Sequence, residues 1–354
     1  MAPATAAAVP ARDVPVARAA PLKAIWGSLQ TLDGRSAFPH YARLGVDVLQ
    51  IQLPWAEVAP RRPHAPRDPA DPAYAWPPAL DEALAAARRR GIEIALMATR
   101  SPAWANGGHD PARAPEPVHF ARFLTAASRR YPEVRRWMIW GETNRTVLFH
   151  PQPKDSPVAP RAYAGILDAA YGALKRRSRR NVVIGGMTMS SADVQPADWL
   201  RWMRLPDGRR PRLDEYGHNP FSISRQRPQL GRGVYANFPT ARDVDLLDVF
   251  AREVRRAYRH DRRHRRSGGP PLWISEFTVS STRPNRAFDY SVSRHGQARW
   301  LRDAYAIARD VGASGFGWFN LQDESPTVER GLTMGLLTSA GRRKPAYRAF
   351  ARLP

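Results

Sequence analysis

Two glutamates stand at the ends of strongly apolar stretches and are the residues best suited to acid–base chemistry. Glu142 follows Trp and Ile in "RWMIWGETNRT", and Glu276 follows the same residue types in "PLWISEFTVSS". Apolar surroundings raise the pKa of a carboxyl group, which suits a general acid, while a hydrogen-bonded carboxylate nearby stays ionised as a nucleophile. Two such groups define a glycoside-hydrolysis pair, although either glutamate alone could simply pair with an arginine.

Eight short runs rich in Ile, Val, Leu or Trp predict the strands that must position these glutamates. They cover residues 24–30, 46–53, 92–98, 134–141, 182–188, 213–218, 272–277 and 314–320. Helical patterns lie between them, at residues 38–44, 79–90, 116–131, 160–180, 196–203, 243–260, 295–312 and 344–352. Strict alternation predicts parallel strands with crossover helices, and eight units favour a closed (β/α)8 TIM barrel in a single domain, residues 24–354. In such a barrel the C-terminal ends of the strands carry the chemistry.

The charge of the chain needs an explanation before any partner is inferred. The 354 residues carry a net charge of +23, supplied almost entirely by arginine. Many arginines fall at predicted helix ends, as in "AAARRRG" and "LKRRSRRN", where they suit the helix dipole and solvent. This placement argues against a nucleic-acid partner and leaves a polyanion-binding protein as the less favoured alternative.

Several other classes of protein lose support. The chain has no cysteine and no G-x-G-x-x-G or P-loop motif, so we expect no cofactor and no metal site. No run of about 18 apolar residues predicts a membrane span. Residues 1–23 are rich in Ala and Pro and lack the apolar core of a signal peptide, so we interpret them as a disordered leader. The sequence indicates no oligomeric state.

The segments around both glutamates resemble glycoside hydrolase clan A, in particular the family 5 and family 39-like barrels. There, strand four ends in W-N-E-P-N and strand seven in W-x-x-E-F/Y, and the matching segments here are "WGETN" and "WISEF". The segments "LQIQLPWAEVAP", "MATRSPAWAN", "DEYGHNPFS" and "GLLTSAGRRKPAYRAF" agree in order. The resemblance implies a retaining glycosidase with Glu142 as acid/base and Glu276 as nucleophile, an oligo- or polysaccharide substrate, and a secreted or cell-envelope location.

Three departures from the family pattern bear on activity. Gly141 replaces the asparagine that holds the sugar 2-hydroxyl, and Phe221 stands where a tyrosine would orient the nucleophile. The strand-two arginine has no counterpart, because Gln50 and Gln52 occupy that stretch. A carbohydrate-binding barrel with impaired catalysis is therefore the main alternative to a β-glycosidase.

The remaining candidates are polar or aromatic side chains near predicted strand ends, where they could bind a sugar: Asn144, His218, Trp318, Trp55, Trp104 and Arg100. Each has a structural alternative, since Asn favours turns, a lone His is often satisfied internally, and Trp packs in cores. The loop at 222–243 mixes arginines such as Arg227 with aromatics and could grip an anionic sugar, or lie free in solvent.

Overall fold

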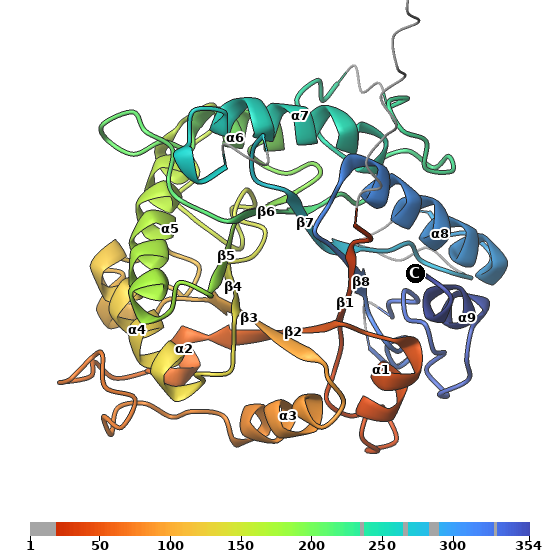
Figure 1. The fold of residues 1–354 in the computed structure, drawn as a ribbon, viewed down its shortest axis with the longest axis horizontal. Coiled ribbons are helices and arrows are strands. Elements are labelled where there is room, and N and C mark those ends of the chain that lie inside the picture. Colours follow the sequence, from red (N-terminus) through yellow and green to blue (C-terminus); the bar gives the residue numbers. More distant parts are fainter. Residues whose placement is uncertain (1–18, 234–236, 265–267, 283–289, 329–330) are drawn as a thin grey trace, which may run out of the picture.

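A closed barrel of parallel strands forms the centre of the molecule (Figure 1). The computed structural model describes residues 19–233, 237–264, 268–282, 290–328 and 331–354. Each strand pairs with the next along the chain, and β8 pairs with β1 to close the circle. The predicted (β/α)8 barrel is therefore confirmed.

Each strand overlaps one of the eight predicted runs. The strands are β1 (Leu22–Trp26), β2 (Val48–Pro54), β3 (Glu93–Thr99), β4 (Arg136–Ile139), β5 (Val182–Met189), β6 (Glu215–Asn219), β7 (Leu272–Phe277) and β8 (Gly315–Phe319). The predicted domain start at residue 24 is two residues too late, because β1 begins at Leu22 and pairs there with Gly315. Residues 1–18 of the predicted leader lie outside the described residues.

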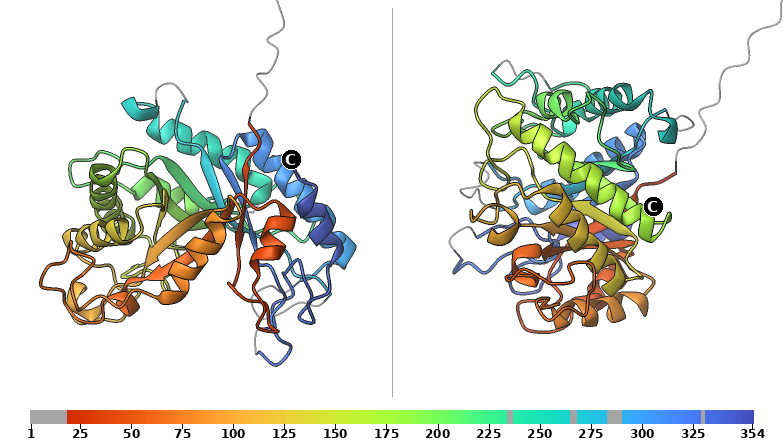
Figure 2. Two further views of the ribbon diagram at one scale, coloured as in Figure 1. Left: turned by 60° about the horizontal axis from the view of Figure 1, so that its bottom comes forward. Right: turned by 90° about the vertical axis from the view of Figure 1, so that its left-hand side faces the viewer.

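The helices form a ring around the barrel (Figure 1), and two further views show the same ribbon from its sides (Figure 2). They are α1 (Phe38–Leu44), α2 (Trp55–Val58), α3 (Pro78–Arg88), α4 (Pro117–Arg130), α5 (Val158–Arg177), α6 (Pro196–Trp202), α7 (Leu247–Tyr258), α8 (Arg294–Val311) and α9 (Pro345–Ala351). Proline in the first turn begins five of them, where its missing N–H costs nothing. Within the described part of the chain, no helix is both long and apolar enough to span a bilayer.

The strands are apolar on both faces, as expected for a parallel sheet covered by helices. In β4, Trp137 and Ile139 join the core between the sheet and the helices, whereas Met138 points into the barrel. Met97, Met187 and the other inward side chains form a second cluster inside the barrel. The inner cluster supports the floor beneath the strand ends.

Glycines in β8 make room for a polar network inside the barrel. A Cβ atom at Gly315 would lie 2.2 Å from the Trp273 ring, and one at Gly317 would lie 2.0 Å from the Ser275 carbonyl oxygen. Trp273 Nε1 donates to Gln50 Oε1 (3.0 Å), and Gln50 Nε2 donates to the Ser275 carbonyl (2.8 Å). Both polar atoms of the Gln50 side chain are thus used in hydrogen bonds inside the barrel.

Candidate active site

Both glutamates line one cavity of about 170 Å³ where the C-terminal ends of the strands meet. Arg100 follows β3, Glu142 follows β4, Asn219 ends β6 and Glu276 is the penultimate residue of β7. The complete lining is Gln52, Met97, Thr99, Arg100, Ala112, Gly141, Glu142, Val147, Leu148, Met187, Asn219 and Glu276. The cavity therefore draws its chemical groups from several separate strands.

The turn that carries Glu142 is held in an unusual backbone conformation. Trp140 and Glu142 have φ angles of 65° and 42°, a region that side-chain-bearing residues seldom adopt. The next residue anchors the turn to β5, because Thr143 donates its N–H to the Met187 carbonyl (3.0 Å) and its hydroxyl to the Gly186 carbonyl (2.8 Å). Such conformations persist only where neighbouring structure enforces them, and they cluster at functional sites.

The carboxylate of Glu142 has two polar contacts. Arg145, three residues along the chain, places Nη1 2.6 Å from Oε2, and Asn219 Nδ2 donates to Oε1 over 3.2 Å. Only 12% of the Glu142 side chain is exposed, whereas the Arg145 side chain is 40% exposed. The ion pair therefore opens to solvent on the arginine side, from which a ligand could displace it.

Glu276 lies in a less polar setting than Glu142. Burial raises the pKa of the Glu276 carboxyl well above its usual value, and the nearby charge of Glu142 raises it further. Its backbone N–H donates to Asn219 Oδ1 (3.1 Å). Glu276 therefore stays protonated over a wider pH range than an isolated glutamate would.

Asn219 and Arg145 are the contacts of the carboxylates that sequence reasoning missed. Asn219 occupies the end of β6 and reaches both glutamates at once. The rule that strand ends carry the chemistry could have identified it, because it directly follows His218 in the quoted segment "DEYGHNPFS". Arg145 follows Glu142 by three positions, a spacing that alone is too common to indicate a site.

The glycine before Glu142 is required by its neighbour Met97. A Cβ atom at Gly141 would lie 2.7 Å from Met97 Sδ and 2.9 Å from its methyl carbon. The methionine thioether thus occupies the space into which a side chain at position 141 would extend. Accommodating an asparagine there requires Met97 to move.

Arg100 lies in the cavity, as its position after a strand predicts. Its φ angle is 58°, and its carbonyl accepts the backbone N–H of Ala56 at the start of α2 (3.0 Å). Within the described residues it forms no ion pair, so its charge is available to a ligand in the cavity.

Asn144 and His218 do not line the cavity, which corrects their expected role in sugar binding. Asn144 is fully buried, and its amide group bonds to backbone atoms of Met189 and Val194. His218 Nε2 donates to the Arg242 carbonyl (2.7 Å), so Nδ1 accepts from the Thr188 hydroxyl (2.9 Å). Burial lowers the pKa of His218 to about 4, and the ring stays neutral. Both residues hold loops in place.

Trp318 and Trp55, which the sequence offered as candidates for sugar binding, are core residues. Both are fully buried. Trp318 Nε1 donates to the Met334 carbonyl (3.1 Å), and Trp55 stacks on Phe123 with ring centroids 5.2 Å apart. The expectation that they contact a sugar is wrong, because helices and loops distant in sequence cover both rings.

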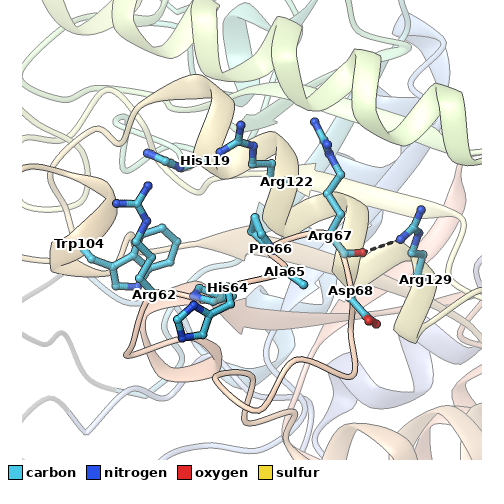
Figure 3. A pocket seen from close by; sticks show the side chains of 11 residues that line it. Arg62, His64, Ala65, Pro66, Arg67, Asp68, Trp104, His119, Arg122 and Arg129 are labelled. Carbon is cyan, nitrogen blue, oxygen red and sulfur yellow. Dashed lines mark hydrogen bonds between the residues drawn. The ribbon is translucent and has the colours of Figure 1, made fainter.

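Trp104 lies in a different cavity from the glutamates. It is partly exposed, and it lines a hollow together with several arginines and histidines (Figure 3). No residue lines both cavities, although both border the segment 100–119. Trp104 is therefore separated from the carboxylate pair.

The other departures and the long loop have clear positions. Gln52 lines the cavity of the two glutamates, whereas Phe221 is buried and does not line it. Arg227, expected to lie free or to bind a sugar, pairs with Asp303 of α8 through Nη2 and Oδ1 (2.8 Å). Among the described residues, no group of three or more His, Asp or Glu side chains is arranged to hold a metal ion.

Comparison with solved structures identifies barrels of the same kind. A family 39 glycoside hydrolase from the gut symbiont Bacteroides cellulosilyticus WH2 matches 94% of this chain with a TM-score of 0.67 and 19% identity. A glucosidase from Croceicoccus marinus matches 96% with a TM-score of 0.67 and 15% identity. A monomeric beta-xylosidase from Caulobacter crescentus CB15 matches 95% with a TM-score of 0.61 and 15% identity. The resemblance to the family 39 barrels is confirmed for the fold.

These structural matches cover only part of the neighbours' chains, and they support the fold alone. This chain spans 63% of the Bacteroides enzyme and 68% of each of the other two chains. No protein-family model matches the sequence, and no curated protein is similar to it. Activity must therefore be argued from the residues of this chain.

Proposed function

We propose that the protein is a glycoside hydrolase that cleaves a β-linked O-glycosidic bond with retention of configuration. The observation that carries the proposal is the shared cavity of Glu142 and Glu276 at the strand ends of this barrel. Glycosidase barrels among the structural neighbours support the same reaction class. Glu142 is the proposed acid/base and Glu276 the proposed nucleophile.

The proposed reaction has two displacements. In the first, the Glu276 carboxylate attacks the anomeric carbon while Glu142 gives its proton to the leaving oxygen, so a glycosyl ester forms as the glycosidic bond breaks. In the second, Glu142 takes a proton from water, the oxygen of that water attacks the anomeric carbon, and the ester bond breaks. The product keeps its original configuration, and both carboxyl groups return to their starting states.

The surroundings of Glu142 and Glu276 require a proton to move before they can act in these roles. The raised pKa of Glu276 favours its protonated form, and Glu142 forms an ion pair with Arg145. The first displacement needs the opposite arrangement, so substrate binding must bring the proton to Glu142. Sugar hydroxyls that donate to Glu276 would stabilise its ionised form, and displacement of the exposed Arg145 side chain would leave Glu142 free to hold the proton.

The dimensions of the cavity favour a small substrate portion. Its volume of about 170 Å³ is below the roughly 300–1,000 Å³ of pockets that enclose drug-sized ligands. One sugar ring is the unit we propose it to hold, with Arg100, Gln52 and Thr99 as candidate partners for the hydroxyls.

The test compares Glu142→Ala and Glu276→Ala on aryl β-glycosides with good and poor leaving groups, with and without azide. Loss of the acid/base should slow substrates with poor leaving groups by roughly 10²–10⁴-fold and spare those that need no proton. Azide should restore Glu142→Ala and give a β-glycosyl azide. In Glu276→Ala it should give the α-azide. Exposed Glu133→Ala is the control and should match the wild type.

The azide product also distinguishes the two role assignments. If Glu276→Ala yields the β-azide and Glu142→Ala the α-azide, Glu276 is the acid/base and Glu142 the nucleophile. Turnover by the wild type that equals that of Glu276→Ala on every glycoside and polysaccharide tried would refute hydrolysis.

A carbohydrate-binding barrel is the second candidate, favoured by one observation. The space for the family asparagine at Gly141 is filled by Met97, so a contact that strengthens in the glycosidase transition state is absent. This candidate predicts calorimetric binding of sugars by the wild type without any hydrolysis.

A further inference from the structure

A second cavity, of about 720 Å³, opens on the outside of the barrel between α4 and the segment 59–77 (Figure 3). Its walls are dominated by basic side chains, which the close-up view shows gathered around one hollow. They are Arg62, His64, Arg67, His119, Arg122 and Arg129. A concentration of cations in a concave surface attracts anions more strongly than the same charges on a convex one.

The guanidinium groups of this cavity are not neutralised within the described chain. Among the described residues, Arg62, Arg122 and Arg129 form no ion pair, although the neighbouring Arg130 pairs with Asp81 over 2.6 Å. The single acidic side chain on the wall is Asp68. The cavity therefore carries a net positive charge that folding leaves uncompensated.

The pKa of His119, which lies in the cavity wall, responds to the charges of the neighbouring arginines. Burial lowers the pKa of His119, the charges of Arg62 and Arg122 lower it further, and the charge of Glu116 partly opposes them. His119 is thus near enough to both arginines to be repelled by them. An anion bound between the arginines would reverse their effect and raise the pKa of His119.

The segment that supplies Arg62 and Arg67 is braced against the barrel. The Asp71 carboxylate accepts the backbone N–H groups of Ala65 (2.7 Å) and Ala73 (2.9 Å). Arg129 Nη1 donates to the Arg67 carbonyl (2.9 Å), which joins the segment to α4. A braced wall loses little conformational entropy when a ligand binds.

Trp104 adds an aromatic surface to the charged cavity. Its Nε1 donates to the Ala59 carbonyl (2.9 Å), and its ring packs edge-on against Trp55 at 5.3 Å. The indole is thereby fixed while part of it stays exposed at the cavity wall. A fixed aromatic ring beside guanidinium groups suits a sugar ring that carries an acidic group.

The basic surface continues beyond this cavity. Arg67 and Arg122 also line an adjoining cavity of about 380 Å³, which shares Arg176 and Arg212 with a third of about 580 Å³. These hollows run from α4 to α5, helices that lie side by side (Figure 1). The positive charge of this track is least compensated at the Trp104 end, because Arg212 pairs with Asp168 (2.7 Å) at the other.

We propose that this track binds an anionic polysaccharide, with Arg62, Arg122 and Trp104 holding one acidic residue of the chain. The choice of a sugar polymer over other polyanions rests on the proposed function. It is also favoured by the aromatic content of the walls, because Trp104 is the one Trp, Phe or Tyr that lines the three cavities. Proteins that bind single-stranded nucleic acids usually stack successive bases on several aromatic side chains.

The test measures binding by calorimetry with polygalacturonate, neutral dextran and a poly-dT oligonucleotide, using the full chain. The variant Arg62→Ala/Arg122→Ala should weaken polygalacturonate binding about tenfold or more, because two charge-assisted contacts are lost. The control Arg256→Ala/Arg348→Ala removes equal charge from α7 and α9, across the barrel (Figure 1), and should change the affinity less than about twofold.

An independent readout uses the wild type alone. The His119 ring resonances should titrate at a higher pH with saturating polygalacturonate than without it. Equal affinity for dextran, tighter binding of the oligonucleotide, an unaffected double variant, or an unmoved His119 titration would each overturn the proposal. If polygalacturonate binds but the wild type turns over no glycoside or polysaccharide faster than Glu276→Ala does, the proposed function alone is refuted. Turnover without binding at the track refutes this inference alone.

Discussion

The side-chain amide of Asn219 donates to Oε1 of Glu142 over 3.2 Å. Its carbonyl oxygen accepts the backbone N–H of Glu276 over 3.1 Å. One buried amide at the end of β6 thus sets the orientation of the proposed acid/base and the strand position of the proposed nucleophile. Because it touches Glu142 directly, its removal should alter catalysis more than stability.

Asn219→Ala is expected to lower kcat by roughly 10–150-fold, the equivalent of one hydrogen bond to a charged group. KM should change little if the bond mainly positions Glu142. Asn181→Ala is the matched control, since Asn181 is also buried and donates one side-chain bond, to the Leu174 carbonyl (2.9 Å). Equal losses of kcat in both variants would assign Asn219 a purely structural role.

Stability should depend on pH through Glu276. Its pKa is raised in the folded state, so its stabilising contribution is complete below the unfolded value of about 4.3 and is lost as pH rises through the folded pKa. Glu276→Gln cannot ionise. Its Tm should equal that of the wild type near pH 4 and exceed it by a few degrees near pH 8. A Tm difference that does not vary with pH would contradict the raised pKa, and Glu133→Gln should show no such trend.

Gly141 and Met97 should behave as a coupled pair. Gly141→Asn alone should cost about 1–3 kcal/mol of unfolding free energy, because its Cβ would clash with the thioether of Met97. In a Met97→Ala background the same substitution should cost less, because the thioether with which it clashes is gone. If the asparagine then reaches the sugar, the double variant should have a higher kcat/KM than Met97→Ala. Additive stability changes in the double-mutant cycle would show that the two positions are independent.

Substitution of Arg100 should affect substrate binding, whereas substitution of Trp318 should affect stability. Arg100→Ala is expected to lower kcat/KM on the best glycoside by about tenfold with little change in Tm, because Arg100 lines the cavity. Trp318→Phe should cost about 1 kcal/mol by removing the bond to the Met334 carbonyl, and KM should stay constant. A KM effect of Trp318→Phe larger than that of Arg100→Ala would restore the tryptophan to the substrate site.

The order of strands and helices was predictable because it is encoded locally. Each strand needs a few β-branched or aromatic residues in sequence, and each helix repeats its apolar face every three or four residues. Runs such as residues 272–277 carry this information without reference to the rest of the chain. The barrel rule then placed Glu142, Glu276 and Arg100 at one end of the molecule, and they do line one cavity.

Only the tertiary structure decided which strand-end residues face that cavity. His218 and Trp318 lie nearer to a strand end than Glu142 does, and Asn144 follows Glu142 by two residues, yet segments distant in sequence bury all three completely. The same long-range packing brings Met97 against Gly141 and separates Trp104 from the glutamates. Sequence periodicity fixes which face of a strand a side chain takes, whereas burial at a strand end depends on loops whose paths are set by the whole fold.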